Sequence, residues 1–226
     1  MATALIEKPF FLTTIGKKYL MGLTGLVWSG FVMGHMLGNM LMFYSADAYN
    51  KYGHALTSGA LIYFVETVLV LSLLVHVICA ISLTIENRAA RGNQRYAMTP
   101  NGSKGASLAS KTMAVQGSVV LAFVILHIAT FKYGTYYETT VDGVVMRDLH
   151  RLLIEVFQQP GYVIWYLVAL VCLGFHLSHG VGSLFQSFGL KNSNNEKLIQ
   201  KLGLIYGLVV AVGFLAQPIY CFLRGS

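Results

Sequence analysis

ALIYFVETVLVLSLLVHVICAISLTI, residues 60–85, decides the class of this protein. Its one charged residue is Glu66, and it also carries a single histidine, His76. The segment is longer than the ~20 apolar residues with which an α-helix crosses the hydrocarbon core of a bilayer. We therefore interpret it as a transmembrane helix.

Four further stretches are free of charged residues and about as long: 19–45, 112–131, 161–186 and 202–223. The chain of 226 residues is 55% hydrophobic and only 11% charged, and its mean hydropathy is +0.61. These values exclude an ordinary soluble domain. The sequence predicts an all-α membrane protein, a single domain over 1–226 built as a bundle of five transmembrane helices joined by polar loops.

A short helix is expected before the fourth span. One apolar stripe in "VVMRDLHRLLIEVF" is formed by Val145, Leu149, Leu152, Val156 and Phe157. A stripe of this kind opposite polar residues is typical of a helix that lies in the membrane interface. We place it on the outer surface.

The positive charges indicate the orientation. Eleven lie on the side of the N-terminus: Lys8, Lys17, Lys18, Arg88, Arg91, Arg95, Lys104, Lys111, Lys191, Lys197 and Lys201. Five lie on the other side: Lys51, Lys132, Arg147, Arg151 and Arg224. Because positive charge marks cytoplasmic loops, the N-terminus is predicted inside and the C-terminus outside. The net charge of +7 is thus a topology signal, and no nucleic-acid partner is expected.

Each of the first four predicted helices carries a histidine at a similar distance from its start: His35, His76, His127 and His176. That distance corresponds to roughly 22 Å along a ~30 Å core. Successive helices run in opposite directions, so His35 and His127 fall near the outer face and the other two near the inner face. The two levels are expected roughly 14 Å apart.

One intramembrane histidine alone is most often a hydrogen-bonded packing residue. Four at matched depth favour haem, because two imidazoles from different helices can bind one iron from its two sides. Zinc fits less well, since two histidines leave it short of ligands. The sequence contains no CxxCH, so we expect two non-covalent b haems.

Glycines near the histidines leave two interpretations open. Gly30, Gly34 and Gly38 follow one another at four-residue spacing around His35, and Gly180 follows His176 by four. Small residues at this spacing can admit a flat ring or can serve helix packing alone.

The chain resembles a known family over nearly its whole length. The resemblance rests on "IGKKYLMGLTGLVWSGFVMGHMLGNM" (15–40), "AYNKYGHAL" (48–56), "ETVLVLSLLVHVICAISLTIENRAAR" (66–91), "GSVVLAFVILHIATFKYG" (117–134) and "GFHLSHGVGSLFQSFG" (174–189). These segments are similar to the cytochrome b membrane-anchor subunit of bacterial succinate dehydrogenases and fumarate reductases, of the five-helix, di-haem type.

The resemblance implies a role for each histidine. His35 and His127 would bind the distal, outer haem, and His76 and His176 the proximal haem, which faces the iron–sulfur subunit. The family's pattern in the fourth helix selects His176 over His179. His179 would then be a haem-propionate donor, an alternative ligand or a residue of local packing. It further implies flavoprotein and iron–sulfur subunits on the cytoplasmic face of a bacterial inner membrane, and leans towards menaquinone as the quinone.

Glu66 is the one acidic residue well inside a span, which makes it a candidate for proton exchange with a quinone. The alternative is a packing carboxyl hydrogen-bonded to Asn39 or Tyr44. The chain has no dinucleotide fingerprint, no phosphate loop and no cysteine set for iron–sulfur clusters. We therefore expect an anchor and electron-relay subunit that does not itself oxidise succinate. A di-haem cytochrome b of another dehydrogenase, and a haem-free transporter or scaffold, remain alternatives.

Overall fold

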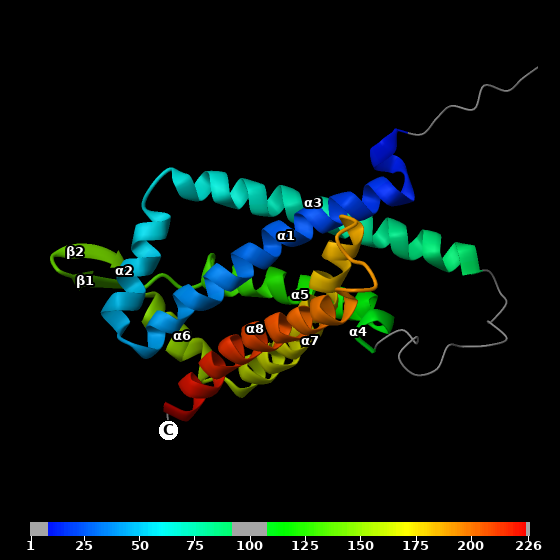
Figure 1. The fold of residues 1–226 in the computed structure, drawn as a ribbon. Coiled ribbons are helices and arrows are strands. Elements are labelled where there is room, and N and C mark those ends of the chain that lie inside the picture. Colours follow the sequence, from blue (N-terminus) through cyan, green and yellow to red (C-terminus); the bar gives the residue numbers. More distant parts are fainter. Residues whose placement is uncertain (1–8, 92–107, 225–226) are drawn as a thin grey trace, which may run out of the picture.

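Five long helices dominate the computed structural model, which describes residues 9–91 and 108–224 (Figure 1). They are α1 (Thr14–Asn39), α3 (Leu61–Arg91), α5 (Met113–Phe131), α7 (Pro160–Ser187) and α8 (Glu196–Arg224). All five are long and apolar enough to cross a membrane. The predicted all-α bundle of five spans is confirmed, and the protein is a multi-pass membrane protein.

The ends of the spans follow local capping rules. α1 begins at Thr14, five residues before the expected 19, because the Thr13 hydroxyl caps it by accepting the N–H of Gly16 at 3.1 Å. A short 3-10 turn, η1 (Phe10–Leu12), precedes the cap, and a second, η2 (Met40–Phe43), extends the helix. α7 ends just before Gly189, whose φ of +71° is the left-handed conformation that favours glycine.

Two regions expected to be loops are ordered elements. α2 (Ala46–Thr57) forms where Ser45 caps it by accepting the N–H of Ala48 at 3.0 Å. Strands β1 (Glu138–Val141) and β2 (Val144–Arg147) pair as an antiparallel hairpin. Its turn residues, Asp142 and Gly143, both have positive φ, which matches the twist of a two-residue hairpin turn.

The short helix before the fourth span exists as α6 (Leu149–Phe157), but its apolar stripe lacks one expected residue. Val145 lies in β2 and is exposed, because the hairpin takes up the residues before Asp148, which caps α6. Of the rest of the stripe, Leu152, Val156 and Phe157 are buried in the core, and Leu149 is half-buried. The stripe therefore packs against the bundle.

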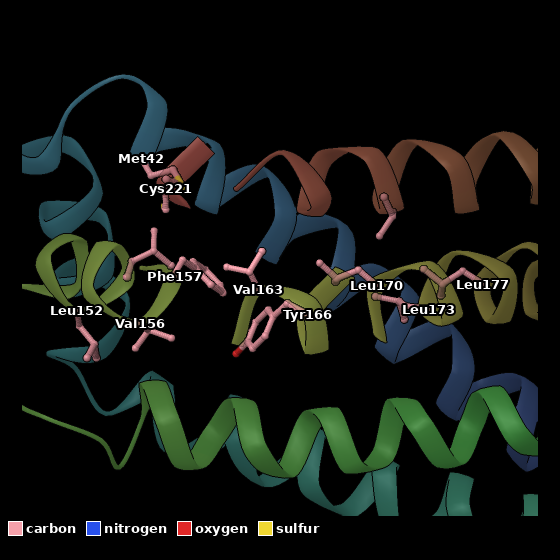
Figure 2. Close-up of a cluster of buried hydrophobic side chains, with 12 residues drawn as sticks. Met42, Leu152, Val156, Phe157, Val163, Tyr166, Leu170, Leu173, Leu177 and Cys221 are labelled. Carbon is pink, nitrogen blue, oxygen red and sulfur yellow. The ribbon is translucent and has the colours of Figure 1, made fainter. Parts of the chain in front are cut away.

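The core lies where α6, α7 and α8 meet (Figure 2). Phe157 of α6, Tyr166 of α7 and Cys221 of α8 belong to it. α7 and α8 approach closely because small residues face each other: a Cβ on Gly207 would lie 2.5 Å from the carbonyl oxygen of Gly174.

Of the remaining spans, α1 and α5 pack on α7, and α3 packs on α1. α1 contacts both α3 and α7, and α5 lies along α7, with its short precursor α4 (Leu108–Lys111) nearby (Figure 1). α3 exposes a row of large apolar side chains, such as Leu74, Ile78 and Ile85. A surface of this kind requires lipid as its solvent.

The bundle has two distinct ends. The hairpin end contains α2, the β1–β2 hairpin, α6 and the end of α8 (Figure 1). The N end contains the start of α1, the end of α3 and the start of α8. The termini of the described chain lie at opposite ends, as an odd number of spans requires.

Candidate functional site

The four intramembrane histidines form two pairs. The rings of His35 (α1) and His127 (α5) have centroids 5.8 Å apart, and we call them the hairpin-end pair. The rings of His76 (α3) and His176 (α7) have centroids 6.4 Å apart, and we call them the N-end pair. The structure therefore brings together the same partners that depth and the family resemblance paired.

The two pairs lie at different depths. His76 contacts Thr24 of α1, eleven residues before His35, which is about 16 Å along a helix. His176 lies against Gly117 of α5, ten residues before His127, or about 15 Å. Both values agree with the expected separation of roughly 14 Å.

Aromatic rings enclose the hairpin-end pair. Phe31 stacks on His35 with centroids 5.3 Å apart and an interplanar angle of 13°. Phe123 stacks on His127 at 5.6 Å and 30°. Each phenylalanine stands four residues before its histidine, so both are on the same helix face. This stacking fixes the orientation of both imidazoles.

Polar contacts complete the hairpin-end pair. The Tyr166 hydroxyl lies 3.1 Å from Nδ1 of His127. On the other helix, the Asn39 amide donates to the carbonyl of His35 at 2.7 Å and accepts from the Tyr49 hydroxyl at 2.8 Å. Burial raises the pKa of Tyr49, which lies in α2, so the phenol stays a donor.

The N-end pair has less polar support. The Thr24 hydroxyl donates to the carbonyl of Leu20 at 2.8 Å. Its oxygen also lies 3.0 Å from Nδ1 of His76. With its own proton on the Leu20 carbonyl, the hydroxyl can accept an Nδ1–H from His76, the tautomer that leaves Nε2 with its lone pair. Nδ1 of His176, in contrast, is buried without a hydrogen-bond partner.

Two glycines that the sequence analysis missed lie against the N-end pair. A Cβ built on Gly25 of α1 would be 3.6 Å from Cε1 of His76, and one on Gly117 of α5 would be 3.6 Å from Cε1 of His176. Each precedes a hairpin-end histidine by ten residues on the same helix. A glycine inside a helix lowers helix stability by roughly 1 kcal/mol relative to alanine. A glycine within a predicted span therefore indicates that another group approaches the backbone closely.

His176 and His179 occupy different environments on α7. His176 faces His76, whereas Nε2 of His179 lies 3.1 Å from the hydroxyl of Ser183 on its own helix. The rotation of about 60° between positions three residues apart accounts for the difference. The geometry thus favours His176 as the partner of His76.

The residues present fit a haem at each pair. Two imidazoles bound to one iron through nitrogen, at about 2 Å each, would have centroids about 6 Å apart. Within residues 9–91 and 108–224, no three or more His, Cys, Asp and Glu side chains gather into a metal site.

The glycines near the histidines divide between the two interpretations, helix packing and room for a flat ring. Gly38 serves packing, since a Cβ there would clash with the Tyr52 ring at 2.4 Å. A Cβ on Gly30, Gly34 or Gly180 would meet nothing within 4 Å. Gly30 and Gly34 are exposed and Gly180 is half-buried, so the open space beside them has room for a flat ring and equally for lipid.

Glu66 has a different partner from those expected. Its carboxylate forms an ion pair with Lys132, the residue that follows α5. The expected partner Asn39 instead bonds the His35 carbonyl and the Tyr49 hydroxyl, and Tyr44 is 83% exposed. Lys132 directly follows the last residue of α5, which brings it beside Glu66 of α3.

A second carboxylate at the hairpin end is that of Glu155 in α6. A hollow of about 340 Å³ between α5, α6 and α7 is lined by Glu155, Thr130, Gln159 and Tyr162 among others. The Tyr137 hydroxyl donates to Glu155, and this hydrogen bond raises the pKa of Tyr137. A volume in this range is common for small-molecule sites.

The chain matches no protein-family model, no curated protein and no solved structure.

Proposed function

We propose that the chain is the membrane-anchor and electron-relay subunit, a di-haem cytochrome b, of a bacterial succinate:quinone oxidoreductase. The observation that carries this proposal is the pair of imidazole–imidazole contacts, with centroids 5.8 and 6.4 Å apart, at two depths of one bundle. Histidines that serve only helix packing are not expected to form two separate imidazole–imidazole pairs. Electron transfer across a membrane requires redox cofactors at successive depths, and two haem sites at different depths would meet this requirement.

In this proposal His35 and His127 hold the distal haem, and His76 and His176 hold the proximal one. The haem iron, when bound, carries single electrons between the two aqueous sides. The chain supplies the axial nitrogens, the orientation of the rings and the apolar surroundings. Thr24 orients His76 by accepting its Nδ1–H, which leaves Nε2 for the metal.

The N end would face the cytoplasm and the two water-soluble subunits. Among the described residues, Lys17, Lys18, Lys111, Lys191 and Lys197 lie towards this end. Lys8, Arg95 and Lys104, which also entered the charge count, lie outside the described residues. Positive charge at the cytoplasmic side favours this orientation in the bacterial inner membrane, with the iron–sulfur subunit next to the proximal pair and the flavoprotein beyond it.

The quinone, for which we propose menaquinone, would react at the hairpin end. Quinone reduction consumes protons, so the site needs a proton-exchanging group near the distal haem and the outer water. Glu66 remains our candidate. Its partner Lys132 follows His127 by five residues, about 7 Å along the chain of α5. The Glu66–Lys132 ion pair is part-exposed, with side chains 34% and 44% accessible, and Lys132 directly follows α5 at the hairpin end.

Haem content tests the proposal. Acidified solvent should release about two haems per chain from the complex purified in mild detergent, because each imidazole pair binds one. The reduced-minus-oxidised spectrum should be that of a b-type cytochrome. A ratio near zero would leave a haem-free scaffold or transporter. Co-purification with a hydrogenase or formate dehydrogenase, in place of flavoprotein and iron–sulfur subunits, would assign the chain to another dehydrogenase.

A further inference from the structure

Tyr166 presents its hydroxyl to one of the candidate haem ligands. Its oxygen lies 3.1 Å from Nδ1 of His127, and the side chain is only 5% exposed. Figure 2 shows the ring leaving α7 with its oxygen directed towards the green ribbon of α5, the helix that carries His127. The contact therefore joins two spans inside the bundle.

The ring of Tyr166 is held by aromatic neighbours on three sides. Its centroid lies 4.8 Å from that of Phe123 and 4.8 Å from that of Phe157, both nearly perpendicular, and 6.3 Å from Phe131. Phenylalanine would satisfy these packing contacts equally well. A hydroxyl in such a place costs free energy unless it is hydrogen-bonded. The contact with His127 therefore explains why this position holds a tyrosine and not a phenylalanine.

The direction of this hydrogen bond follows from the chemistry of imidazole. A neutral imidazole has one N–H and one lone pair. If Nε2 of His127 binds a metal, the proton must be on Nδ1, and the phenol oxygen must accept it. A hydrogen bond at the second nitrogen commonly fixes the tautomer of a metal-bound histidine and raises its basicity.

We propose that Tyr166 is a positioning residue that accepts the Nδ1–H of His127 and so directs the Nε2 lone pair of His127 to the iron of the distal haem. This inference rests on the proposed di-haem function. A more basic axial ligand stabilises the oxidised iron more than the reduced iron, so Tyr166 lowers the reduction potential of this haem. The N-end pair does not touch Tyr166, so the proximal haem is unaffected.

The test is a redox titration of the whole complex with Tyr166→Phe. Tyr206→Phe is the matched control, because this phenol also bridges two spans but donates to the backbone carbonyl of Ser29 at 2.6 Å. We expect Tyr166→Phe to raise the midpoint potential of one spectral component and Tyr206→Phe to move neither. The shifted component must be the one that His127→Ala removes.

The outcomes separate this inference from the proposed function. A wild-type complex without haem contradicts the proposed function itself. Two haems with no shift in Tyr166→Phe, or an equal shift in both components, overturns the role of Tyr166. If Tyr166→Phe fails to assemble, 3-fluorotyrosine at position 166 decides, because it keeps the shape and weakens the acceptor. A smaller upward shift of the same component supports the proposal, and an unchanged potential overturns it.

Discussion

The two histidine pairs have nearly the same ring separation but different surroundings. The hairpin-end pair is stacked on Phe31 and Phe123. The N-end pair lies against the backbone of Gly25 and Gly117. Side chains orient the imidazoles at one end, whereas close approach of helices does so at the other.

This contrast has a consequence for any haem bound there. Axial ligands of the same type are tuned by hydrogen bonding and by the polarity of their surroundings. His127 contacts a phenol, His76 contacts an alcohol, and His176 has an unpartnered Nδ1. Two haems with identical ligands should therefore have different reduction potentials. Such a difference favours electron transfer from the haem of lower potential to the haem of higher potential.

The largest expected effect comes from removing one histidine of a pair. His35→Ala or His127→Ala should abolish one low-spin spectral component, and His76→Ala or His176→Ala the other, because an iron that loses an axial nitrogen leaves the low-spin state. Optical and paramagnetic-resonance spectra of the four purified variants provide the measurement. Loss of the same component from all four would refute the pairing.

A large effect confined to quinone chemistry is expected from Glu66→Gln. The variant should keep both haem components and oxidise succinate with an artificial acceptor. Its electron exchange with quinone should slow by about a hundredfold, the scale of one lost proton-transfer group. The assay compares the two acceptors in the same preparation.

Glu155→Gln is the matched control for Glu66, since this carboxylate lines the hollow at the same end of the bundle. It should leave quinone exchange intact. Full quinone activity in Glu66→Gln together with slow exchange in Glu155→Gln would move the quinone site to the hollow between α5, α6 and α7.

The smallest effect is expected from His179→Ala. Both haems should remain low-spin, because His179 contacts Ser183 on its own helix and does not face His76. Spectra recorded beside those of His176→Ala test this directly. A His179→Ala variant that lacks the proximal signal, with a His176→Ala variant that retains it, would reverse the assignment within "GFHLSHGVG".

The sequence predicted the spans and the paired histidines well because both depend on position along a helix. Apolar length identifies a span, and the rise per residue converts a residue number into a depth. Depth alone paired His35 with His127 and His76 with His176. The ring contacts in the structure agree with this pairing.

Elements outside the spans were predicted less well. α2 was expected to be a loop, although Ser45 is a common helix-capping residue, and the hairpin was missed although "VDG" between β-branched residues is a turn signal. The composition of such polar segments fits loops and short elements alike. Their structure depends on contacts with the bundle, such as the bond from the Asn50 amide to Asp148 at 2.9 Å.

The sequence by itself determined how many times the chain crosses the membrane and at which depth each histidine lies, since hydropathy and helix rise are local properties. Only the tertiary structure decided which groups surround those histidines. Tyr166 lies 39 residues from His127, Thr24 lies 52 residues from His76, and Lys132 lies 66 residues from Glu66. Helical phase and interhelical packing select such partners, and both are set by how small and large side chains interlock across the bundle.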